Sequence, residues 1–225
     1  GMRGMNRVFQ GAANIDSILR GDLIEKAAEA GLRSVFIGFE TFSPENLKQS
    51  NKKQNLAKDY VAAVNRLHSL GIMINGSFVF GLDEDDKDVF QRTVDWAVNN
   101  GVTTSTFHIL TPYPGTKLYQ DMENEGRILT RNWDLYDTRH VVYKTRHLSA
   151  IELENGYYQA YDSFYSWANI AKASWQHESL KHKLKHFMYA GGWKKFEPLW
   201  NFLIKTKSLN DMLPLLEGIL SKVKR

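Results

Sequence analysis

The sequence predicts an α/β protein: an incomplete (β/α) barrel of about four parallel βα units, followed by an α-helical C-terminal region. Three observations support this fold. Helical patterns end in glycine just before an apolar run at Ala30-Gly31-Leu32, Leu70-Gly71-Ile72 and Asn100-Gly101-Val102. Glycine tolerates the left-handed backbone just past a helix end, so each glycine marks a helix-to-strand junction. The apolar runs are continuous, as in parallel strands covered on both faces, and after Gly126 the repeat gives way to helical patterns.

Four strands are expected, and the first of them is the weakest. They cover residues 8–13, 35–39, 72–80 and 107–110. A closed barrel of eight units takes roughly 250 residues, so about four units are too few to close a barrel. The predicted sheet is therefore open.

The first helices have recognisable start signals. Asp22 and Glu25 have the spacing of a capping box, Ser43-Pro44 gives an N-cap followed by proline at the first helical position, and Asn55 is a third candidate cap. A further helix is expected over residues 88–100, whose apolar residues recur at helical spacing. These helices alternate with the strands, as a βα repeat requires.

An aromatic segment, residues 127–147, separates the repeat from the C-terminal region. Trp133, Tyr136 and Tyr143 are expected to anchor it as a connector across one end of the barrel. Ser149 then begins the helical region, because its spacing to Glu152 is again that of a capping box.

Helices are expected over residues 150–172, 177–190, 193–206 and 208–222. Gly191-Gly192 predicts a break between two of them, and Pro214 a kink in the last. The chain thus divides into a partial barrel, residues 2–148, and a helical appendage, residues 149–225.

Composition limits the function classes. A chain of 225 residues with 43% hydrophobic content buries a substantial core, and the absence of cysteine excludes disulfides and thiolate metal ligands. No apolar run reaches the roughly 20 residues that span a bilayer, so a cytoplasmic protein is expected. The net charge of +4 comes entirely from residues 151–225, with 11 basic and 7 acidic residues. We interpret this excess as a solvated helical face, which makes nucleic-acid binding unlikely.

Metal binding by histidine or acidic clusters is not expected. His182 and His186 have i, i+4 spacing but lack a third ligand of matching spacing, and the acidic run 83–86 is typical of a helix N-terminus. A lone His108 within a strand is more often a core or rim residue than a ligand.

Three motifs lie where successive strands end, which is where α/β proteins place their ligands. Glu40 ends the first strong strand within Gly38-Phe39-Glu40-Thr41. The next strand ends in Ser77-Phe78-Val79-Phe80-Gly81-Leu82-Asp83-Glu84, where Gly81 lets the loop turn without a Cβ. The last ends in Leu110-Thr111-Pro112-Tyr113-Pro114-Gly115-Thr116, a loop stiffened by two prolines. Glu40 as a helix cap and the proline loop as a rigid turn are alternative interpretations.

These motifs resemble those of radical S-adenosylmethionine (SAM) enzymes, most of all the subgroup that also carries a cobalamin-binding domain. The motifs match the family patterns G-[IFV]-E-[ST], G-x-I-x-G-x-x-E, with Ser77 and Val79 in place of its first glycine and isoleucine, and L-[TY]-P-[YF]-P-G-T. The resemblance covers about residues 8–165. It implies a SAM pocket to which the chain contributes a defined set of residues: Glu40, Ser77, Val79, Gly81, Leu110, Thr111 and Pro112.

The resemblance also implies a [4Fe–4S] cluster and, in the subgroup, cobalamin. Family members hold the cluster with a C-x3-C-x2-C segment, and this chain contains no cysteine. The resemblance therefore describes the C-terminal half of such an enzyme, without its cluster-binding part and with no catalytic residue assigned. The chain alone is expected to be inactive and to need an N-terminal half or subunit. Either the chain's own C-terminal helices or a second copy should protect the open sheet edge, and of these we expect a homodimer. The alternative hypothesis is a non-catalytic binding or scaffold module that uses a half-barrel and a basic helical tail.

Overall fold

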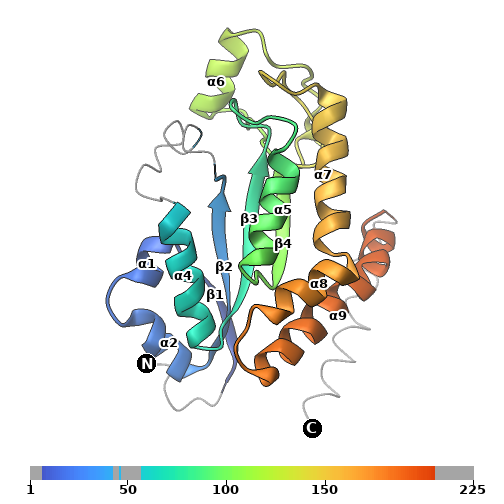
Figure 1. Cartoon of the computed structure of the whole chain (residues 1–225). Helices are drawn as coiled ribbons and strands as arrows, with labels where there is room; N and C mark the ends of the chain where they lie inside the picture. The colour runs from blue at the N-terminus through green and yellow to red at the C-terminus, as the bar shows by residue number, and fades with distance from the viewer. Residues whose placement is uncertain (1–6, 43–45, 47–56, 206–225) are drawn as a thin grey trace.

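The computed structural model describes residues 7–42, 46 and 57–205. A parallel sheet of four strands lies against a layer of helices (Figure 1). The elements in chain order are β1 (Phe9–Ala12), α1 (Ile15–Leu19), α2 (Leu23–Ala30), β2 (Leu32–Glu40), α4 (Ala57–Ser69), β3 (Met73–Phe80), α5 (Val89–Asn99), β4 (Thr104–Ile109), α6 (Lys117–Asn124), the 3-10 turn η1 (Trp133–Leu135), α7 (Ala150–Phe164), α8 (Trp167–Trp175) and α9 (Leu180–Lys205).

The sheet is open, and its strand order is β1-β2-β3-β4 with every pair parallel. This arrangement confirms the predicted incomplete (β/α) barrel with a helical C-terminal region. Glycines in the left-handed region lie at the end of α2 and shortly after α4 and α5, as predicted: Gly31, Gly71 and Gly101 have φ of 115°, 66° and 63°. No described helix is long and apolar enough to cross a bilayer.

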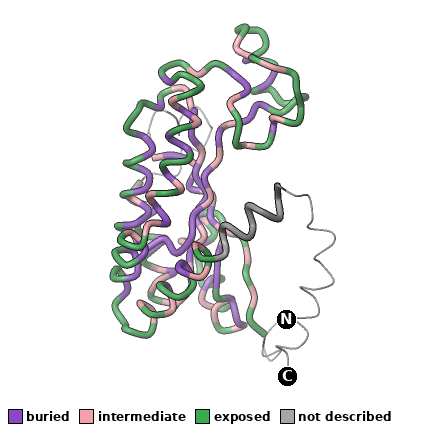
Figure 2. The backbone as a smooth tube through the Cα atoms, turned by 90° about the vertical axis from the view of Figure 1, so that its right-hand side faces the viewer, coloured by how far each residue is buried: buried purple, intermediate pink, exposed green. Residues whose placement is uncertain are grey.

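One face of the sheet packs against the helices through aromatic side chains. Phe39 contacts Tyr60 of α4 and Trp96 of α5, with ring centroids 5.2 and 5.1 Å apart. Phe80 and Phe107 continue this packing toward α5 and α7. The buried residues follow these helices and strands along the length of the sheet (Figure 2). Because side chains alternate along a strand, the residues between these aromatics belong to the opposite face, which we call the inner face.

Helix α7 and its C-cap residue close the free edge of β4 with two tyrosine hydroxyls. The Tyr165 hydroxyl accepts from the Ser105 amide at 3.1 Å and donates to the Ser105 carbonyl at 2.9 Å. The Tyr161 hydroxyl makes the same pair of contacts with Phe107, at 3.1 and 3.3 Å. The Ile109 amide donates to the Thr138 carbonyl at 2.7 Å. The outward backbone groups of this edge strand are thus satisfied without another strand.

The C-terminal helices differ from the prediction in two places. The expected helix 150–172 is two helices, because α7 ends at Phe164 and the Ser166 side chain caps α8 by accepting from the Asn169 amide. The expected break at Gly191-Gly192 is wrong, since α9 runs through it. Gly191 instead allows close packing: a Cβ there would lie 3.0 Å from the ring of Trp167.

Other predicted start signals had mixed outcomes. The Ser149–Glu152 capping box is present, whereas Asp22 makes no capping hydrogen bond. Asp22 pairs with Lys26 at 2.7 Å, and Glu25 is drawn to Arg66 of α4 at 2.7 Å. Helix α1 was not predicted. Ser43, Pro44, Asn55, Pro214 and helix 208–222 lie outside the described residues.

Two of the three predicted connector anchors are buried. Tyr136 and Tyr143 join a small core with Tyr119, Met122 and Val142 near α6. Trp133 is half exposed and contacts the rings of Tyr119 and Tyr136, with centroids 6.4 and 4.9 Å apart.

Four histidines meet at the amino ends of the strands, where α8 and α9 pack under the sheet. His177 Nε2 lies 2.9 Å from His186 Nδ1, and the rings of His177 and His68 have centroids 4.4 Å apart. A Cβ on Gly71 would lie 2.9 Å from His182 Nε2, so this glycine permits the close approach. Within the described part of the chain, no three histidine or acidic side chains are placed to hold a metal ion.

Candidate functional site

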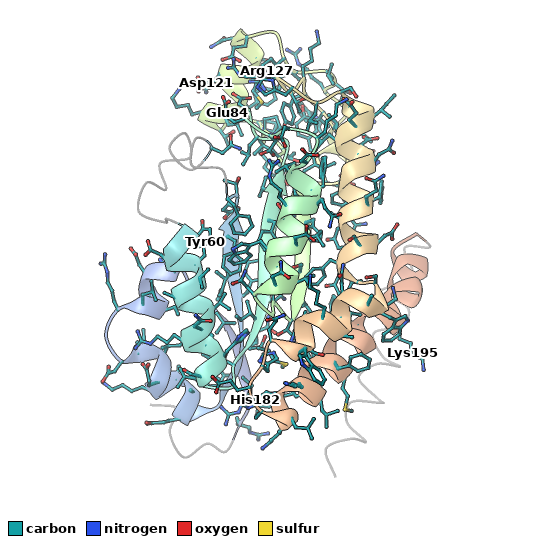
Figure 3. All side chains as sticks on the ribbon, viewed as in Figure 1. Tyr60, Glu84, Asp121, Arg127, His182 and Lys195 are labelled. Carbon is teal, nitrogen blue, oxygen red and sulfur yellow. The ribbon has the colours of Figure 1, made fainter. Side chains whose placement is uncertain are left out.

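The predicted site residues come together at the carboxyl ends of β2, β3 and β4. Strand β2 ends at Glu40, Gly81 directly follows β3, and Leu110 directly follows β4. Since the three strands are parallel neighbours, their loops leave from the same edge of the sheet. His182 lies at the opposite end of the molecule from the loops that carry Glu84 and Arg127 (Figure 3).

Glu40 has an unusual backbone conformation. Its φ is 65°, a value that non-glycine residues seldom adopt, and the β2–β3 register shifts between Gly38 and Glu40. Phe39 holds the turn, because its carbonyl accepts from the Thr41 amide at 2.9 Å and from the Tyr60 hydroxyl at 2.7 Å.

The Glu40 carboxylate consequently folds back over Gly38. Its Oε1 lies 2.7 Å from the place where a Cβ on Gly38 would be, so the carboxylate occupies the space that a side chain at this position would take. A carboxylate held in this way at a sheet edge accepts hydrogen bonds from hydroxyl and ammonium groups.

Small and polar side chains occupy the neighbouring inner face. Ser77 pairs with Gly38 on one side and with Thr106 on the other. Asn75 Oδ1 and Thr106 Oγ1 are buried atoms with no hydrogen-bond partner in the described structure. The inside of a closed barrel is normally filled by bulky branched residues, whereas this part of the face carries small and polar side chains.

His108 also lies on the inner face, paired with Val79 of β3. Its Nδ1 is 3.2 Å from the hydroxyl of Thr138, the other non-glycine residue with positive φ, at 66°. Burial lowers the pKa of His108, while the nearby Glu40 carboxylate opposes that shift. The imidazole is therefore predominantly neutral near pH 7 and stands close enough to Glu40 to sense its charge.

The loop after β3 is fixed by a buried carboxylate. Asp85 accepts from the amides of Gly81 and Leu82 at 2.9 and 3.0 Å, and from the Asn46 side chain at 2.9 Å. Burial raises the pKa of Asp85 to about 6, although these hydrogen bonds oppose the shift. Asp85 thus sets the path of the Gly81 loop.

Gly81 itself is required by its surroundings. Its φ is 90°, and an added Cβ would lie 2.8 Å from Leu153 and about as close to the Tyr143 hydroxyl, which donates to the Gly81 carbonyl. Asp83 pairs with Arg127 and Arg146 at 2.6 and 2.9 Å and ties the loop to the connector. Asp83 and Asp85 of the acidic run thus bind structural partners, and the run precedes α5, which begins at Val89.

The side chains of the third motif make structural contacts. The Leu110 side chain packs against the small core around Tyr143, the Thr111 hydroxyl donates to the Ile109 carbonyl at 3.0 Å, and Pro112 is buried. Of the predicted site residues, Glu40, Ser77 and Val79 belong to the inner face or its rim, whereas Gly81 and Leu110–Pro112 line the rim with main chain.

Sequence reasoning did not find Asn75, Thr106 and Thr138 and gave His108 no ligand role. Once the strands are located, alternation places Asn75, Thr106 and His108 on the inner face. Thr138 belongs to an irregular segment, and no sequence signal indicates its position.

Sequence comparisons find relatives among methyltransferases, although no family model matches the chain. A bacteriochlorophyllide d C-12(1)-methyltransferase of Chlorobaculum tepidum is 31% identical over 172 residues, which are 76% of this chain and 37% of the relative. The hopanoid C-2 methylase of Rhodopseudomonas palustris is 26% identical, over 52% of this chain and 22% of the relative. An anaerobic magnesium-protoporphyrin IX monomethyl ester cyclase of Cereibacter sphaeroides is 24% identical, over 79% and 29%.

Solved structures share the fold. Coproporphyrinogen III oxidase (HemN) of Escherichia coli, a radical SAM enzyme, matches with a TM-score of 0.52 at 12% identity, over 71% of this chain and 32% of that one. The cobalamin-dependent SAM radical enzyme OxsB matches with a TM-score of 0.50 at 16% identity, over 85% and 34%. The chain spans about a third of the length of the first curated relatives, 37% and 33%.

Proposed function

Since the chain is a relative of radical SAM proteins of the cobalamin-associated subgroup, we propose that it forms part of the SAM pocket of a methyltransferase. Glu40 binds the ribose hydroxyls or the ammonium group of SAM. Ser77 and Val79, with the main chain of Gly81 and of Leu110–Pro112, line the remainder of the pocket. The methyltransferase relatives support methyl transfer as the reaction class.

The folded-back Glu40 carboxylate is the observation that carries this proposal. A turn that served only to start a helix would not require a left-handed glutamate above a glycine. The strained backbone aims an anionic group at the inner face, which also carries the unpartnered Asn75 and Thr106 oxygens. Placing a ligand there satisfies polar atoms that the sheet itself leaves without partners.

The residues of this chain do not fit the iron–sulfur cluster of the family. Such clusters are held by cysteine thiolates, and the chain has no cysteine. We therefore assign it no step in radical generation and propose that the cluster is supplied by an N-terminal half or by another subunit. We assign no residue to cobalamin. A cluster-bearing part would complete the pocket across the open side of the sheet.

Nuclear magnetic resonance of the isotope-labelled chain tests the SAM pocket. Adding SAM is expected to shift amide signals at the carboxyl ends of β2, β3 and β4, with binding weakened at least about tenfold in Glu40→Gln because a charged hydrogen bond is lost. Glu29→Gln, at the amino-end side of the sheet, is the matched control and should bind as the wild type does. Shifts confined to the amino ends, or no shifts at millimolar SAM, would favour the alternative of a non-catalytic module.

A further inference from the structure

Helix α9 carries an uncovered apolar stripe. Leu180, Leu184 and Met188 follow one another at intervals of four residues, and they are 69%, 55% and 74% exposed. Residues at this spacing lie above one another on one side of a helix. Phe187 lies next to the stripe and is also exposed. The stripe therefore faces away from the sheet, which α9 contacts through His182 and His186.

Helix α8 widens this apolar surface with two tryptophans. Trp167 and Trp175 are both more than half exposed. Trp167 contacts Phe187 with ring centroids 5.9 Å apart, so the two helices present one continuous surface. We call this the α8–α9 face. Soluble monomers seldom expose so many large apolar side chains together without a partner.

Lysines flank the stripe on both sides. At 100° per residue, Lys181 and Lys185 fall on one flank, Lys183 and Lys194 fall on the other, and Lys195 falls in line with the stripe beyond Met188. Lys183 and Lys194 lie over the rings of Trp175 and Trp167, at 4.1 and 6.0 Å. Residues 179–196 contain no aspartate or glutamate. Lys195 points outward from α9 (Figure 3).

We propose that the α8–α9 face binds the surface of an anionic lipid bilayer. Lysine is depleted in protein–protein interfaces, whereas an aliphatic stripe between lysines, with tryptophans at its border, is the pattern of a helix that lies in the membrane surface. The lysine stems cover apolar surface while their ammonium groups reach the headgroups. An aliphatic centre also distinguishes the face from a nucleic-acid surface, which requires aromatic rings for base stacking.

Vesicle co-sedimentation of the full chain tests the proposal. Vesicles with equal parts phosphatidylglycerol and phosphatidylcholine are expected to bind the protein, and vesicles of phosphatidylcholine alone at least about tenfold more weakly, since headgroup attraction is removed. Tryptophan fluorescence should shift to shorter wavelength on binding. The double variant Leu184→Ser/Met188→Ser should reduce the affinity at least about tenfold, because the buried apolar area is lost.

Two controls distinguish binding through the α8–α9 face from non-specific binding to vesicles. Leu129→Ser/Ile151→Ser removes exposed apolar residues outside the face and should bind as the wild type does. Lys181→Glu should weaken binding to the anionic vesicles more than Lys144→Glu does. Circular dichroism shows whether each variant is folded. Equal binding by wild type and Leu184→Ser/Met188→Ser, no sedimentation with the anionic vesicles, or loss of self-association in that variant without an effect on lipid binding would overturn the proposal.

Discussion

Glu40 combines two features that seldom occur together. Its backbone is left-handed, and its carboxylate packs over Gly38 on the inner face. A non-glycine residue in this region costs on the order of 1 kcal/mol or more, and that cost persists only when the surroundings impose it. Tyr60 and Thr41, which both bind the Phe39 carbonyl, provide such surroundings. The residue thus carries strain at the point where the proposed ligand binds.

Replacing Glu40 with glycine should separate stability from binding. Glycine adopts φ of 65° without strain, so Glu40→Gly should keep or raise the free energy of unfolding by up to about 1 kcal/mol, while SAM binding is lost. Glu40→Ala retains the strain and should be less stable than Glu40→Gly. Urea unfolding of the three proteins measures this order. If Glu40→Ala and Glu40→Gly are equally stable, the left-handed backbone is not maintained in solution.

At the scale of elements, the edge of β4 depends on side chains instead of a further strand. Tyr165 is almost fully buried, and its hydroxyl satisfies both backbone groups of Ser105. Tyr161 does the same at Phe107. Helix α7 therefore does for β4 what a neighbouring strand does within a sheet, and it protects the edge from pairing with another chain.

Removing the Tyr165 hydroxyl should lower the free energy of unfolding. Tyr165→Phe leaves a buried amide and a buried carbonyl without partners, which costs about 1–3 kcal/mol in the free energy of unfolding. Chemical denaturation measures the loss, and hydrogen exchange should quicken at Ser105. Tyr158→Phe, on the exposed face of the same helix, is the matched control and should change stability little. Equal stability of the two variants would show that water replaces the hydroxyl.

The sequence predicts the parts of the fold that repeat a local rule. Gly31, Gly71 and Gly101 identify the junctions because a left-handed glycine after a helix depends on local geometry alone. Helix α1 is short, and the Asp22–Glu25 signal misleads because Arg66, which is 41 residues from Glu25, competes for that carboxylate. Gly191 was mistaken for a helix break for a similar reason. It is a glycine because Trp167 of α8 packs against it, and a contact between two helices cannot be read from local sequence.

The candidate site follows the same division. Its place at the strand ends follows from parallel topology, and the motifs identify Glu40 and the Gly81 loop. The role of Asp85 depends on burial and on Asn46, which no periodicity reveals. Thr138 contacts His108 from an irregular segment, so no sequence pattern predicts that contact.

At the scale of the whole molecule, the histidine cluster joins the C-terminal helices to the sheet. Burial lowers the pKa of His68 to about 4 and that of His186 to about 3, and it lowers the pKa of His177 as well. Lys183 and Lys185 of α9 also face the cluster, and their charges lower the pKa of His177 further. The junction is therefore built to hold neutral imidazoles.

Acidification should loosen this junction. Each histidine titrates near 6.5 when unfolded, so its contribution is complete above pH 6.5 and is lost as the pH falls toward the folded pKa values. A shift of one pKa unit corresponds to about 1.4 kcal/mol, which makes the loss several kcal/mol for the cluster. Asp85, whose pKa is raised, offsets part of it between pH 6 and 3.8.

Urea unfolding between pH 7.5 and 5 measures this dependence. The midpoint should fall steadily with pH in the wild type, and His186→Gln should have a flatter profile because one titrating group is gone. His140→Gln, which replaces an exposed histidine that contacts Asp137, is the control and should follow the wild type. A wild-type midpoint that is constant across this range would contradict the prediction.

The other edge of the sheet, at β1, differs from β4 because no described side chain closes it. Phe9 and Ala13 donate their amides toward β2, so the amides of Gln10 and Ala12 point outward by alternation. An uncovered parallel edge pairs with another strand, whether from a cluster-bearing part or from a second copy.

We therefore expect the isolated chain to self-associate through β1. Light scattering over a concentration series should show a dimer, and Gln10→Pro should shift it toward monomer, because proline removes an outward donor while the β2 ladder stays intact. Leu184→Ser/Met188→Ser should leave the dimer unchanged, which separates this edge from the α8–α9 face. A strict monomer at high concentration would mean that β1 is too short to template pairing.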